Sequence, residues 1–517
     1  MRITFLGHVG LHVETDRGSV LCDPWFNPAY FASWFPFPRN DHLDPSAFAR
    51  PDYLYVSHLH HDHYDPAFLW AHVDKRTTVL LPAFPTDHLE RELRGVGFTE
   101  FVHLDDARPA TLPGGLEVAC VALTAPADGP LGDSALVVSD GRTRILDQND
   151  ARPRDLAAIE ALGPFDGEFV QFSGAIWYPM VYDFPEEERR REGIRKRAAQ
   201  MERALHYIEA VRPANVFPCA GPPCFLDDDL VAFNDLDGDP ANIFPDQTVF
   251  LDLMEQRGIG PGHLVVPGSV IELDGPRCTV THPTGDASPD AIFADKRAHI
   301  EAYRADWKTR LEAEKATWPR GRHDVVESLR LWWEPLLEMA PLTRAGVGAP
   351  LLLHMGDDAV HVDFPAGTVG RWDGSAPYRY RFDVDRALVE WCIDHRVEDW
   401  VNEVFLSCRF TAHRDGDYNE FLYTFFKCLS VERMAFCEGW YAEATHEDEE
   451  FECGGFSVQR RCPHLRADLT RFGELLDDGT TLHCKVHGWE FDLATGRCLT
   501  SDEERYRIRS RPSCPSD

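Results

Sequence analysis

This sequence has too few basic residues for a protein that binds nucleic acid or an anionic membrane. Its 517 residues include 52 Lys and Arg against 86 Asp and Glu, which gives a formal net charge of −34. Both partners require a basic face, so we expect neither. The negative charge would suit a basic redox partner, although it also serves simply as a source of solubility.

Long apolar runs and targeting signals are also missing. No uncharged stretch reaches the ~18 residues that a membrane span needs. Residues 1–13 contain His8 and His12 and lack the basic start and long apolar centre of a signal peptide. Apart from two in a motif described below, the 14 Cys residues are scattered without paired spacing, as is typical of reduced thiols. We therefore expect a cytoplasmic protein.

The sequence contains neither a glycine-rich dinucleotide fingerprint nor a flavin motif. Any reducing equivalents that it uses must therefore come from a separate reductase. Its hydrophobic content of 44%, with 13 Trp and 32 Phe, is ample for well-packed globular domains. A chain of this length is expected to form roughly two to four of them.

A dense cluster of His and Asp follows the apolar segment Tyr53–Val56, in the run Ser57-His58-Leu59-His60-His61-Asp62-His63. Side chains two positions apart at a strand end point the same way, so His58 and His60 can share one metal. Asp62 and His63, just beyond, aim at an adjacent second site. Imidazole and carboxylate suit zinc and iron about equally. His61 occupies the variable position, and we interpret it as solvated or as a neighbour of the ligands.

A second motif lies near the C-terminus, where Cys462-Pro463-His464 is followed by Cys484-Lys485-Val486-His487 and then Gly488-Trp489. Two Cys and two His in paired loops are the ligands of a Rieske [2Fe–2S] cluster. Zinc ribbons also use paired loops, but the combination of C-x-H with C-x-x-H-G-W is more specific. The segment resembles the low-potential Rieske domains of ring-hydroxylating oxygenases and their ferredoxins, which implies Cys462 and Cys484 on one iron and His464 and His487 on the other.

Apolar segments predict a strand-rich N-terminal half with interleaved helices. We expect strands at Met1–Thr15, Ser19–Asp23, Thr78–Leu81, Leu116–Leu123, Ser134–Val138, Thr143–Leu146, Glu168–Phe172 and Asn215–Phe217. Asp140-Gly141 is a dipeptide favoured in tight hairpin turns. An amphipathic helix carries its apolar stripe on Ile194, Ala198, Met201, Leu205 and Ile208. This alternation fits a four-layer α/β/β/α sandwich.

The N-terminal part resembles the metallo-β-lactamase fold, within the branch that has Gly7-His8 and Asp23-Pro24-Trp25. Further stretches are similar to CMP-N-acetylneuraminate hydroxylase, namely residues 145–153, 173–180, 217–221 and 400–425, the last with Asn402-Glu403. That family also carries a Rieske domain, though at its N-terminus. The similarity covers most of residues 1–425 at modest identity.

This resemblance implies that His58, His60, Asp62 and His63 are metal ligands and that Asp150 is the metal-bridging carboxylate. The fold normally supplies another His shortly before the strand that starts at Asp133, but residues 124–132 contain none. Asp128 could substitute for it. Whether the site holds one metal or two stays open.

We expect an α/β chain in three parts: a metallo-β-lactamase catalytic domain (1–285), a helical or α+β module that completes or covers it (286–430), and an all-β Rieske domain (431–517). In the module, the stripe Ile300, Tyr303, Trp307 and Leu311 is interpreted as core packing. Basic residues at 189–191 and 195–197 follow acidic residues on one predicted helix. We interpret them as a solvated charged face rather than a phosphate site.

The leading hypothesis is an O2-dependent non-haem iron monooxygenase that hydroxylates a C–H or N–H group of a small polar metabolite. Electrons would pass from an external reductase, ferredoxin or cytochrome through the Rieske cluster to iron in the N-terminal site. The resemblance implies a sugar-nucleotide N-acyl group as substrate, but no residue that would bind one is identified. A homo-oligomer is expected by analogy with Rieske oxygenases that pass electrons between subunits.

Two alternatives are a zinc-dependent hydrolase with a Rieske redox-sensing domain, and an electron-transfer protein with a degenerate metallo-fold. The Rieske domain weighs against the first, because Zn²⁺ cannot accept its electron. The intact His/Asp motif weighs against the second. A ring-hydroxylating oxygenase large subunit is excluded, because its Rieske domain precedes the catalytic domain.

Overall fold

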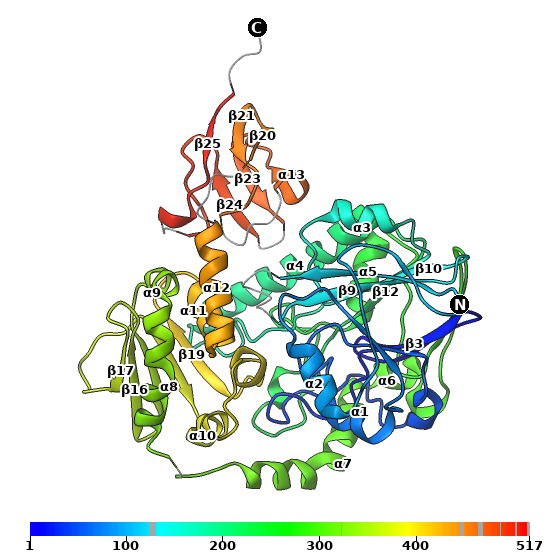
Figure 1. The fold of residues 1–517 in the computed structure, drawn as a ribbon, viewed down its shortest axis with the longest axis horizontal. Helices are drawn as coiled ribbons and strands as arrows, with labels where there is room; N and C mark the ends of the chain where they lie inside the picture. Colours follow the sequence, from blue (N-terminus) through cyan, green and yellow to red (C-terminus); the bar gives the residue numbers. More distant parts are fainter. Residues whose placement is uncertain are drawn as a thin grey trace.

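The protein is represented by a computed structural model that describes residues 1–124, 131–321, 323–444, 449–463, 469–485, 488–501 and 504–513. Figure 1 shows three parts: a large body, a smaller module beside it, and a C-terminal domain above both. No helix in the described ranges is both long and apolar enough to cross a membrane.

Two sheets face each other in the body. The first, in spatial order, is β14 (Arg277–Thr281), β13 (Val270–Asp274), β1 (Arg2–Gly7), β2 (Gly10–Thr15), β3 (Gly18–Cys22), β4 (Tyr53–Tyr55), β5 (Thr78–Leu81) and β6 (Phe101–His103). The second is β12 (Val216–Cys219), β11 (Gly167–Gln171), β10 (Arg144–Asn149), β9 (Asp133–Ser139), β8 (Glu117–Leu123) and β7 (Ala110–Thr111). One apolar cluster joins their inner faces and includes Phe5, Val20, Leu136 and Phe169.

Helices cover both outer faces. On the first sheet, α1 (Pro66–His72) and α2 (His88–Val96) bury Phe68, Leu89 and Leu93. On the second, α3 (Leu156–Leu162), α4 (Glu186–Val211) and α5 (Gln247–Arg257) bury apolar side chains against strands β8 to β12. The four-layer sandwich predicted from the sequence is confirmed.

The prediction of one strand over residues 1–15 is wrong, because β1 and β2 are separate strands that pair antiparallel. The chain reverses after Gly7, the last residue of β1, where Gly7 and His8 have positive φ values of 109° and 55° that lie outside the usual range of an extended strand. The stripe predicted on α4 is only half right. Met201, Leu205 and Ile208 are buried, whereas Ile194 is 46% exposed.

The smaller module is built on a third sheet, β17 (Thr368–Arg371), β16 (Asp358–Asp363), β15 (Leu351–Met355), β18 (Tyr380–Val384) and β19 (Phe410–Arg414). Its helices are α8 (Val325–Met339), α9 (Pro341–Val347), α10 (Arg386–Asp394), α11 (Glu420–Lys427) and α12 (Val431–Ala444). The chain reaches it from the body through α6 (Pro289–Ala294) and α7 (Lys296–Thr317), which buries Ile300, Tyr303 and Leu311 (Figure 1).

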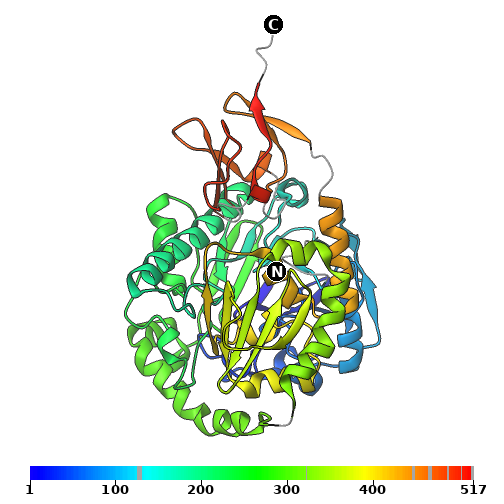
Figure 2. The ribbon, with the colours of Figure 1, turned by 90° about the vertical axis from the view of Figure 1, so that its left-hand side faces the viewer.

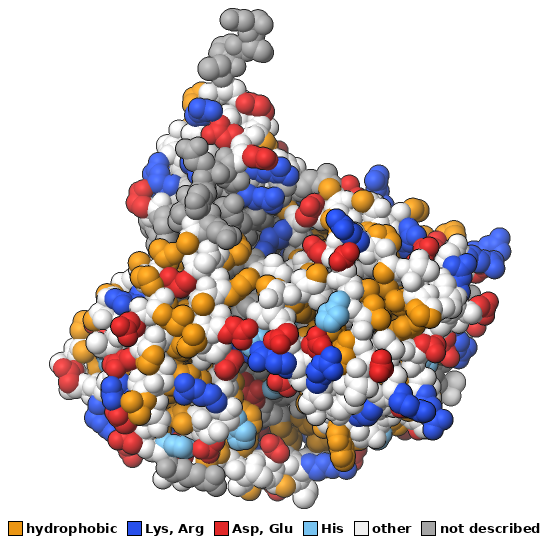
Figure 3. Space-filling model, in the orientation of Figure 1, with side chains coloured by type: hydrophobic (Ala, Val, Ile, Leu, Met, Phe, Trp, Pro, Cys, Tyr) orange, Lys and Arg blue, Asp and Glu red, His pale blue; other side chains and the backbone are white. Residues whose placement is uncertain are grey.

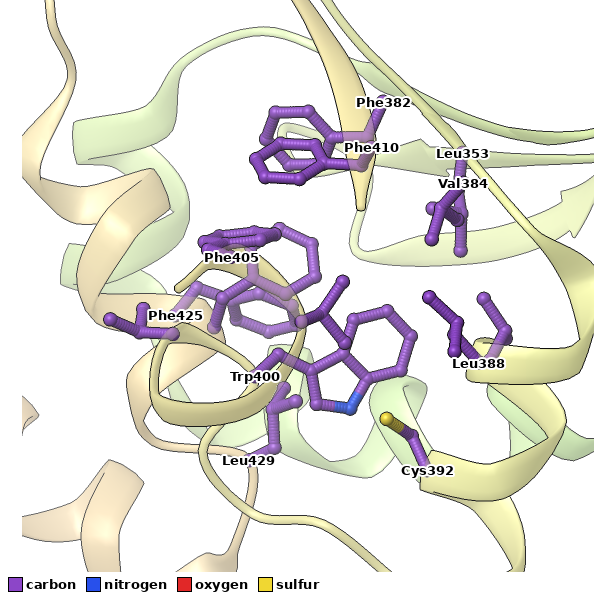
Figure 4. Packing of buried hydrophobic residues seen from close by; sticks show 14 of the residues in the cluster. Leu353, Phe382, Val384, Leu388, Cys392, Trp400, Phe405, Phe410, Phe425 and Leu429 are labelled. Carbon is purple, nitrogen blue, oxygen red and sulfur yellow. The ribbon is translucent and has the colours of Figure 1, made fainter. Parts of the chain in front are cut away.

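Aromatic side chains fill the core of this module. Trp400 lies between Phe405, Leu388 and Cys392, with Phe382 and Phe410 on the sheet side (Figure 4). The same apolar cluster includes Trp25, Tyr30 and Trp34 from the body. Because one core spans both parts, the module is fixed rigidly against the body. Its last helix, α12, packs on α8 and α9, and the β-structure that follows begins only at β20.

The C-terminal domain is made of two small sheets: β20 (Glu450–Cys453), β21 (Phe456–Gln459) and β25 (Ser510–Pro512), and β22 (Gly473–Leu475), β23 (Thr481–Cys484) and β24 (Trp489–Asp492), with the short α13 (Leu469–Phe472). Figure 2 shows this domain seated on the body. Its apolar core extends into the body at Leu156 and Tyr207. On the face in Figure 3, acidic and basic side chains are interspersed with hydrophobic ones.

Candidate metal centres

The predicted ligands of the N-terminal motif lie in the loop between β4 and α1. The ring of His58 is centred 4.4 Å from that of His60 and 4.1 Å from that of His63. His58, Asp62 and His63 are buried, with 2%, 3% and 0% of their surface exposed. Such close, buried imidazoles and carboxylate lack the bulk water that would otherwise solvate them.

The donor atoms fall into two groups whose members lie within 4.8 Å of one another. One group comprises His58, His60 and Asp150, and the other His8, Asp62 and His63. Asp150 Oδ1 is also 3.5 Å from His63 Nε2, so this carboxylate faces both groups. The arrangement can hold two adjacent cations.

His8 was missed as a candidate ligand by the sequence reasoning. Its Nε2 atom lies 2.9 Å from Asp62 Oδ2, and the side chain is 4% exposed. The positive φ of His8 turns it back toward the motif loop, a conformation that non-glycine residues seldom adopt except at turns and functional sites. A His next to Gly7 at the end of a first strand was the only signal in the sequence.

Buried partners orient the ligands. Asp23 Oδ2 lies 2.9 Å from His63 Nδ1 and also accepts from the Ser57 hydroxyl at 2.6 Å. Tyr30 donates its hydroxyl to Asp62 Oδ1. Because Nδ1 of His63 is engaged, its Nε2 is directed at the donor groups, a common arrangement around metal-bound His.

Asp150 is positioned by its neighbour at the end of β10. Asn149 has a φ of 47°, and its side-chain oxygen accepts from the backbone N–H of Asp150 at 2.7 Å. The Asn149 amide in turn donates to the carbonyl of Ser134 on β9 at 2.9 Å. The carboxylate therefore projects from the end of the second sheet toward the loop of the first.

The donor atoms have the chemistry that a metal requires. Among the described residues, His58 Nε2 is buried and makes no hydrogen bond, and His63 Nε2 and Asp150 Oδ1 face each other only at 3.5 Å, whereas His8 Nε2 lies 2.9 Å from Asp62 Oδ2. Buried polar groups normally have partners, and leaving one without costs about 1–3 kcal/mol. Converging atoms of this kind fit cations, and imidazole with carboxylate suits iron as well as zinc.

The protonation states of His58 and His60 favour metal binding. Burial, together with the charge of His63, lowers the pKa of His58 well below its usual range. Burial and the charge of His58 do the same for His60. Burial also opposes charging of His63, but Asp150, Asp62 and Asp23 outweigh it and raise that pKa. Neutral imidazoles at His58 and His60 are the form that binds metal.

The sequence lacks the His that the family pattern places shortly before β9, and the segment where it would stand lies partly outside the described residues. Asp128, the predicted substitute for the missing His, falls in the range 125–130. Nearby, Asp133 Oδ1 lies 3.3 Å from His58 Nδ1. That carboxylate therefore faces the side of the ring opposite the donor atom Nε2.

The middle module contacts the motif loop directly. Asn402, in the π-helical turn η4 (Val401–Phe405), donates to the carbonyl of Leu59 at 2.9 Å. Glu403 Oε2 lies 3.2 Å from His61 Nδ1, and the His61 ring stacks on Tyr30. These contacts define His61 as a neighbour of the ligands.

The C-terminal motif has its two thiols on or beside strands of the small sheets. Cys484 ends β23, Cys462 follows β21, and both are 0% exposed within the core of the domain. Buried Cys side chains with little access to water fit a thiolate-bound iron. His464 and His487 lie outside the described residues.

The C-terminal domain matches the Rieske [2Fe-2S] domain family over residues 445–510. The predicted C-terminal Rieske domain is therefore confirmed, and it follows a body with the predicted α/β/β/α layers. Residues 325–443 match the Rv3818-like, SCP2-like domain family. That assignment was not foreseen from the sequence.

Full-length relatives define the family. A Rieske 2Fe-2S iron-sulfur protein of Mycolicibacterium smegmatis is 47% identical over 98% of this chain and 100% of its own length. The protein Rv3818 of Mycobacterium tuberculosis H37Rv, of the same description, is 46% identical over 99% of this chain and 100% of its own. The chain belongs to this Rv3818-like family of Rieske iron–sulfur proteins.

More distant similarities cover only part of this chain. Igni18, a metallo hydrolase of Ignicoccus hospitalis, is 18% identical at a TM-score of 0.37 over 55% of this chain and 99% of that one. CmlA, a diiron beta-hydroxylase of Streptomyces venezuelae, is 20% identical at a TM-score of 0.36 over 53% of this chain and 54% of that one. A UPF0173 metal-dependent hydrolase of Haloquadratum walsbyi is 31% identical over 20% of this chain and 37% of its own.

Proposed function

We propose that this protein is a Rieske-coupled, O2-dependent non-haem iron monooxygenase. It would receive electrons from an external reductase through the Rieske domain and hydroxylate a small polar metabolite. The observation that carries the proposal is the convergent set of His and Asp donor atoms in the N-terminal site, in a chain that also has a one-electron carrier. A redox-inert metal would have no use for that carrier.

The metal ligands would be His58, His60, Asp62, His63 and Asp150, with His8 as an additional donor. Iron bound there would supply the reduction of O2 that hydroxylation requires. The protein's own part is to hold these side chains in place. Asp23 fixes the ring of His63, and Tyr30 fixes the carboxylate of Asp62.

The domain arrangement supports electron delivery to this site. The C-terminal domain packs on Leu156 and Tyr207 of α3 and α4. Leu156 begins α3 only a few residues after Asp150, so the docking surface continues from the edge of the sheet that carries this carboxylate. Docking through an apolar core fixes the position of this domain on the body.

The site also excludes stray water. The motif loop is covered by η4 through the Asn402 and Glu403 contacts, and by the shared aromatic core behind Tyr30. A dry, fixed site is what the protein contributes when a cofactor performs the redox chemistry. The metal site does not indicate whether a C–H or an N–H group is hydroxylated. It also contains no residue that identifies the sugar-nucleotide substrate implied by the resemblance.

The second candidate is a zinc-dependent hydrolase with a Rieske redox-sensing domain. The partial similarity to the metal-dependent hydrolase of Haloquadratum walsbyi favours it, and so does the donor set, which zinc also accepts. In that case the same ligands would lower the pKa of a bound water.

Metal analysis of anaerobically purified protein separates the two. The Rieske cluster alone accounts for about two irons per chain, so about three or four would support the oxygenase. About two irons with stoichiometric zinc, and full activity without air or reductant, would establish the hydrolase instead.

A further inference from the structure

Four cationic side chains gather beside the candidate metal site. Lys196 and Arg203 lie two turns apart on one face of α4, Arg152 follows Asp150 by two residues, and Arg414 ends β19 of the middle module. Their electrostatic influence on one another shows that they are close. The pKa of Lys196 is lowered to about 7 by burial and then by Arg203, Arg152, Arg195 and Arg414.

This cluster lacks acidic partners. Among the described residues, no carboxylate lies within ion-pair distance of Arg152, Lys196, Arg203 or Arg414. Their neighbours on the same helix differ: Arg190 pairs with Asp239 at 2.6 Å, Arg195 with Glu192 at 2.6 Å and Arg197 with Asp235 at 3.2 Å.

Unused hydrogen-bond donors point into the same region. Arg152 Nε and Arg414 Nε are buried and make no hydrogen bond within the described part of the chain, and neither does Gln171 Nε2, on a side chain that is 6% exposed. Gln171 belongs to the cluster, because its Oε1 accepts from Arg152 Nη2 at 3.3 Å. The Arg414 guanidinium is held over the rings of Tyr178 and Tyr182, at 4.7 and 5.2 Å from their centroids.

Assembling like charges without a counter-ion is unfavourable. The pKa of Arg203 is lowered to about 9, mainly by burial and then by Arg152, while Asp150 acts in the opposite direction. Tyr207, one turn after Arg203 on α4, donates to the carbonyl of Pro153 at 3.0 Å, which holds this part of the helix beside the segment that carries Asp150 and Arg152. The cluster also lies at the carboxyl ends of the parallel strands β10, β11 and β12, where open α/β sheets commonly bind ligands.

We propose that Arg152, Lys196, Arg203 and Arg414, with the amide of Gln171, bind a phosphate or diphosphate group of a small molecule. Four cations exceed what one carboxylate can neutralise, and planar guanidinium groups match phosphoryl oxygens. The further step, that this molecule is the substrate, rests on the proposed function, because the reaction would take place at the adjacent metal site that includes Asp150. Binding of the phosphate itself does not depend on the proposed function.

The test measures binding of inorganic phosphate and pyrophosphate to the purified holoprotein by isothermal titration calorimetry. We expect saturable binding, weakened at least tenfold by Arg203→Gln and by Lys196→Gln, about 1.4 kcal/mol or more each. The matched control is Arg190→Gln on the same helix, whose loss removes only an exposed pair with Asp239 and should leave the affinity unchanged. Absence of binding to the wild-type protein, or equal weakening by the control, overturns the proposal.

A phosphate ion could instead bind a metal in the N-terminal site. His58→Ala should remove that metal and keep the phosphate affinity if the cation cluster is the site. Loss of binding in His58→Ala with retention in Arg203→Gln overturns the proposal. If acetate binds as tightly as phosphate, the assignment of a phosphoryl group is overturned. If the protein binds phosphate but holds no iron beyond that of the Rieske cluster, only the proposed oxygenase function is refuted.

Discussion

His61 Nδ1 lies 3.2 Å from Glu403 Oε2, and this contact joins the motif loop of the body to the middle module. The His61 ring stacks on Tyr30, which donates to the metal-facing carboxylate of Asp62. A continuous set of contacts therefore runs from Glu403 to a candidate ligand. The middle module takes part in shaping the site as well as covering it.

Glu403→Gln should lower turnover by roughly 10-fold, in the range seen when partners of metal ligands are changed. The reason is that His61 loses the carboxylate that holds it against Tyr30. His61→Ala should have a similar effect, and the double variant should be no worse than either, because both changes break one chain of contacts. Steady-state rates at constant metal content measure this. Glu398→Gln, which alters only a contact with Arg433, is the control, and additive losses would contradict the coupling.

His58→Ala should abolish product formation and leave the visible and EPR spectra of the Rieske cluster intact. His58 is a candidate ligand in the body, whereas the cluster motif lies in a separate core. Spectra and metal content of the purified variant test this. Loss of the cluster signal in His58→Ala would mean that the assignment of two separate sites is wrong.

The layered fold was predictable because its signals are local. Strands β5, β8, β9 and β10 lie at or within a few residues of the predicted positions, and the Asp140-Gly141 hairpin joins β9 to β10. The separation of β1 from β2 was not predictable, because apolar residues recur all along residues 1–15 and the turn is marked by the positive φ values of Gly7 and His8. Exposure of Ile194 likewise depends on where α4 extends past its sheet.

The site was predictable only where its residues are contiguous. The motif His58 to His63 is visible in the sequence, and Asp150 came from resemblance. His8, Asp23 and Tyr30 are brought to it by the fold, so spacing alone could not reveal them. Lys196 was interpreted within a solvated face. That holds for Arg195, whose side chain is 66% exposed, but not for Arg197, which is 11% exposed and bonds Asp235, nor for Lys196.

Cys484→Ala should bleach the cluster spectrum and leave the metal of the N-terminal site in place. Turnover should then depend on a chemical reductant that reaches that metal directly. Visible absorption and iron content give the result. The matched control is Cys498→Ala, another buried thiol of the same domain that lies outside the motif, and it should keep the spectrum. Equal bleaching in both variants would indicate that the domain had merely lost its fold.

His206 makes docking of the Rieske domain sensitive to acid. Its ring packs against Phe472 of that domain, and burial, with the charge of Lys485, lowers the pKa of His206 to about 4 from 6.5. A depressed His pKa means that the unfolded chain binds more protons between these values. The stabilisation contributed by neutral His206 is therefore complete above pH 6.5 and is lost as the pH falls toward 4.

Replacing His206 with Leu should keep the apolar contact and remove this proton uptake. The melting temperature of His206→Leu should therefore fall less than that of the wild type between pH 7.5 and pH 5, as measured by calorimetry at fixed ionic strength. His103→Leu, at a ring that is 69% exposed on β6, should follow the wild-type slope. If the melting temperature of His206→Leu falls with pH as much as that of the wild type, His206 is not the cause of the acid sensitivity. Other buried His residues such as His58 would then account for the whole loss of stability.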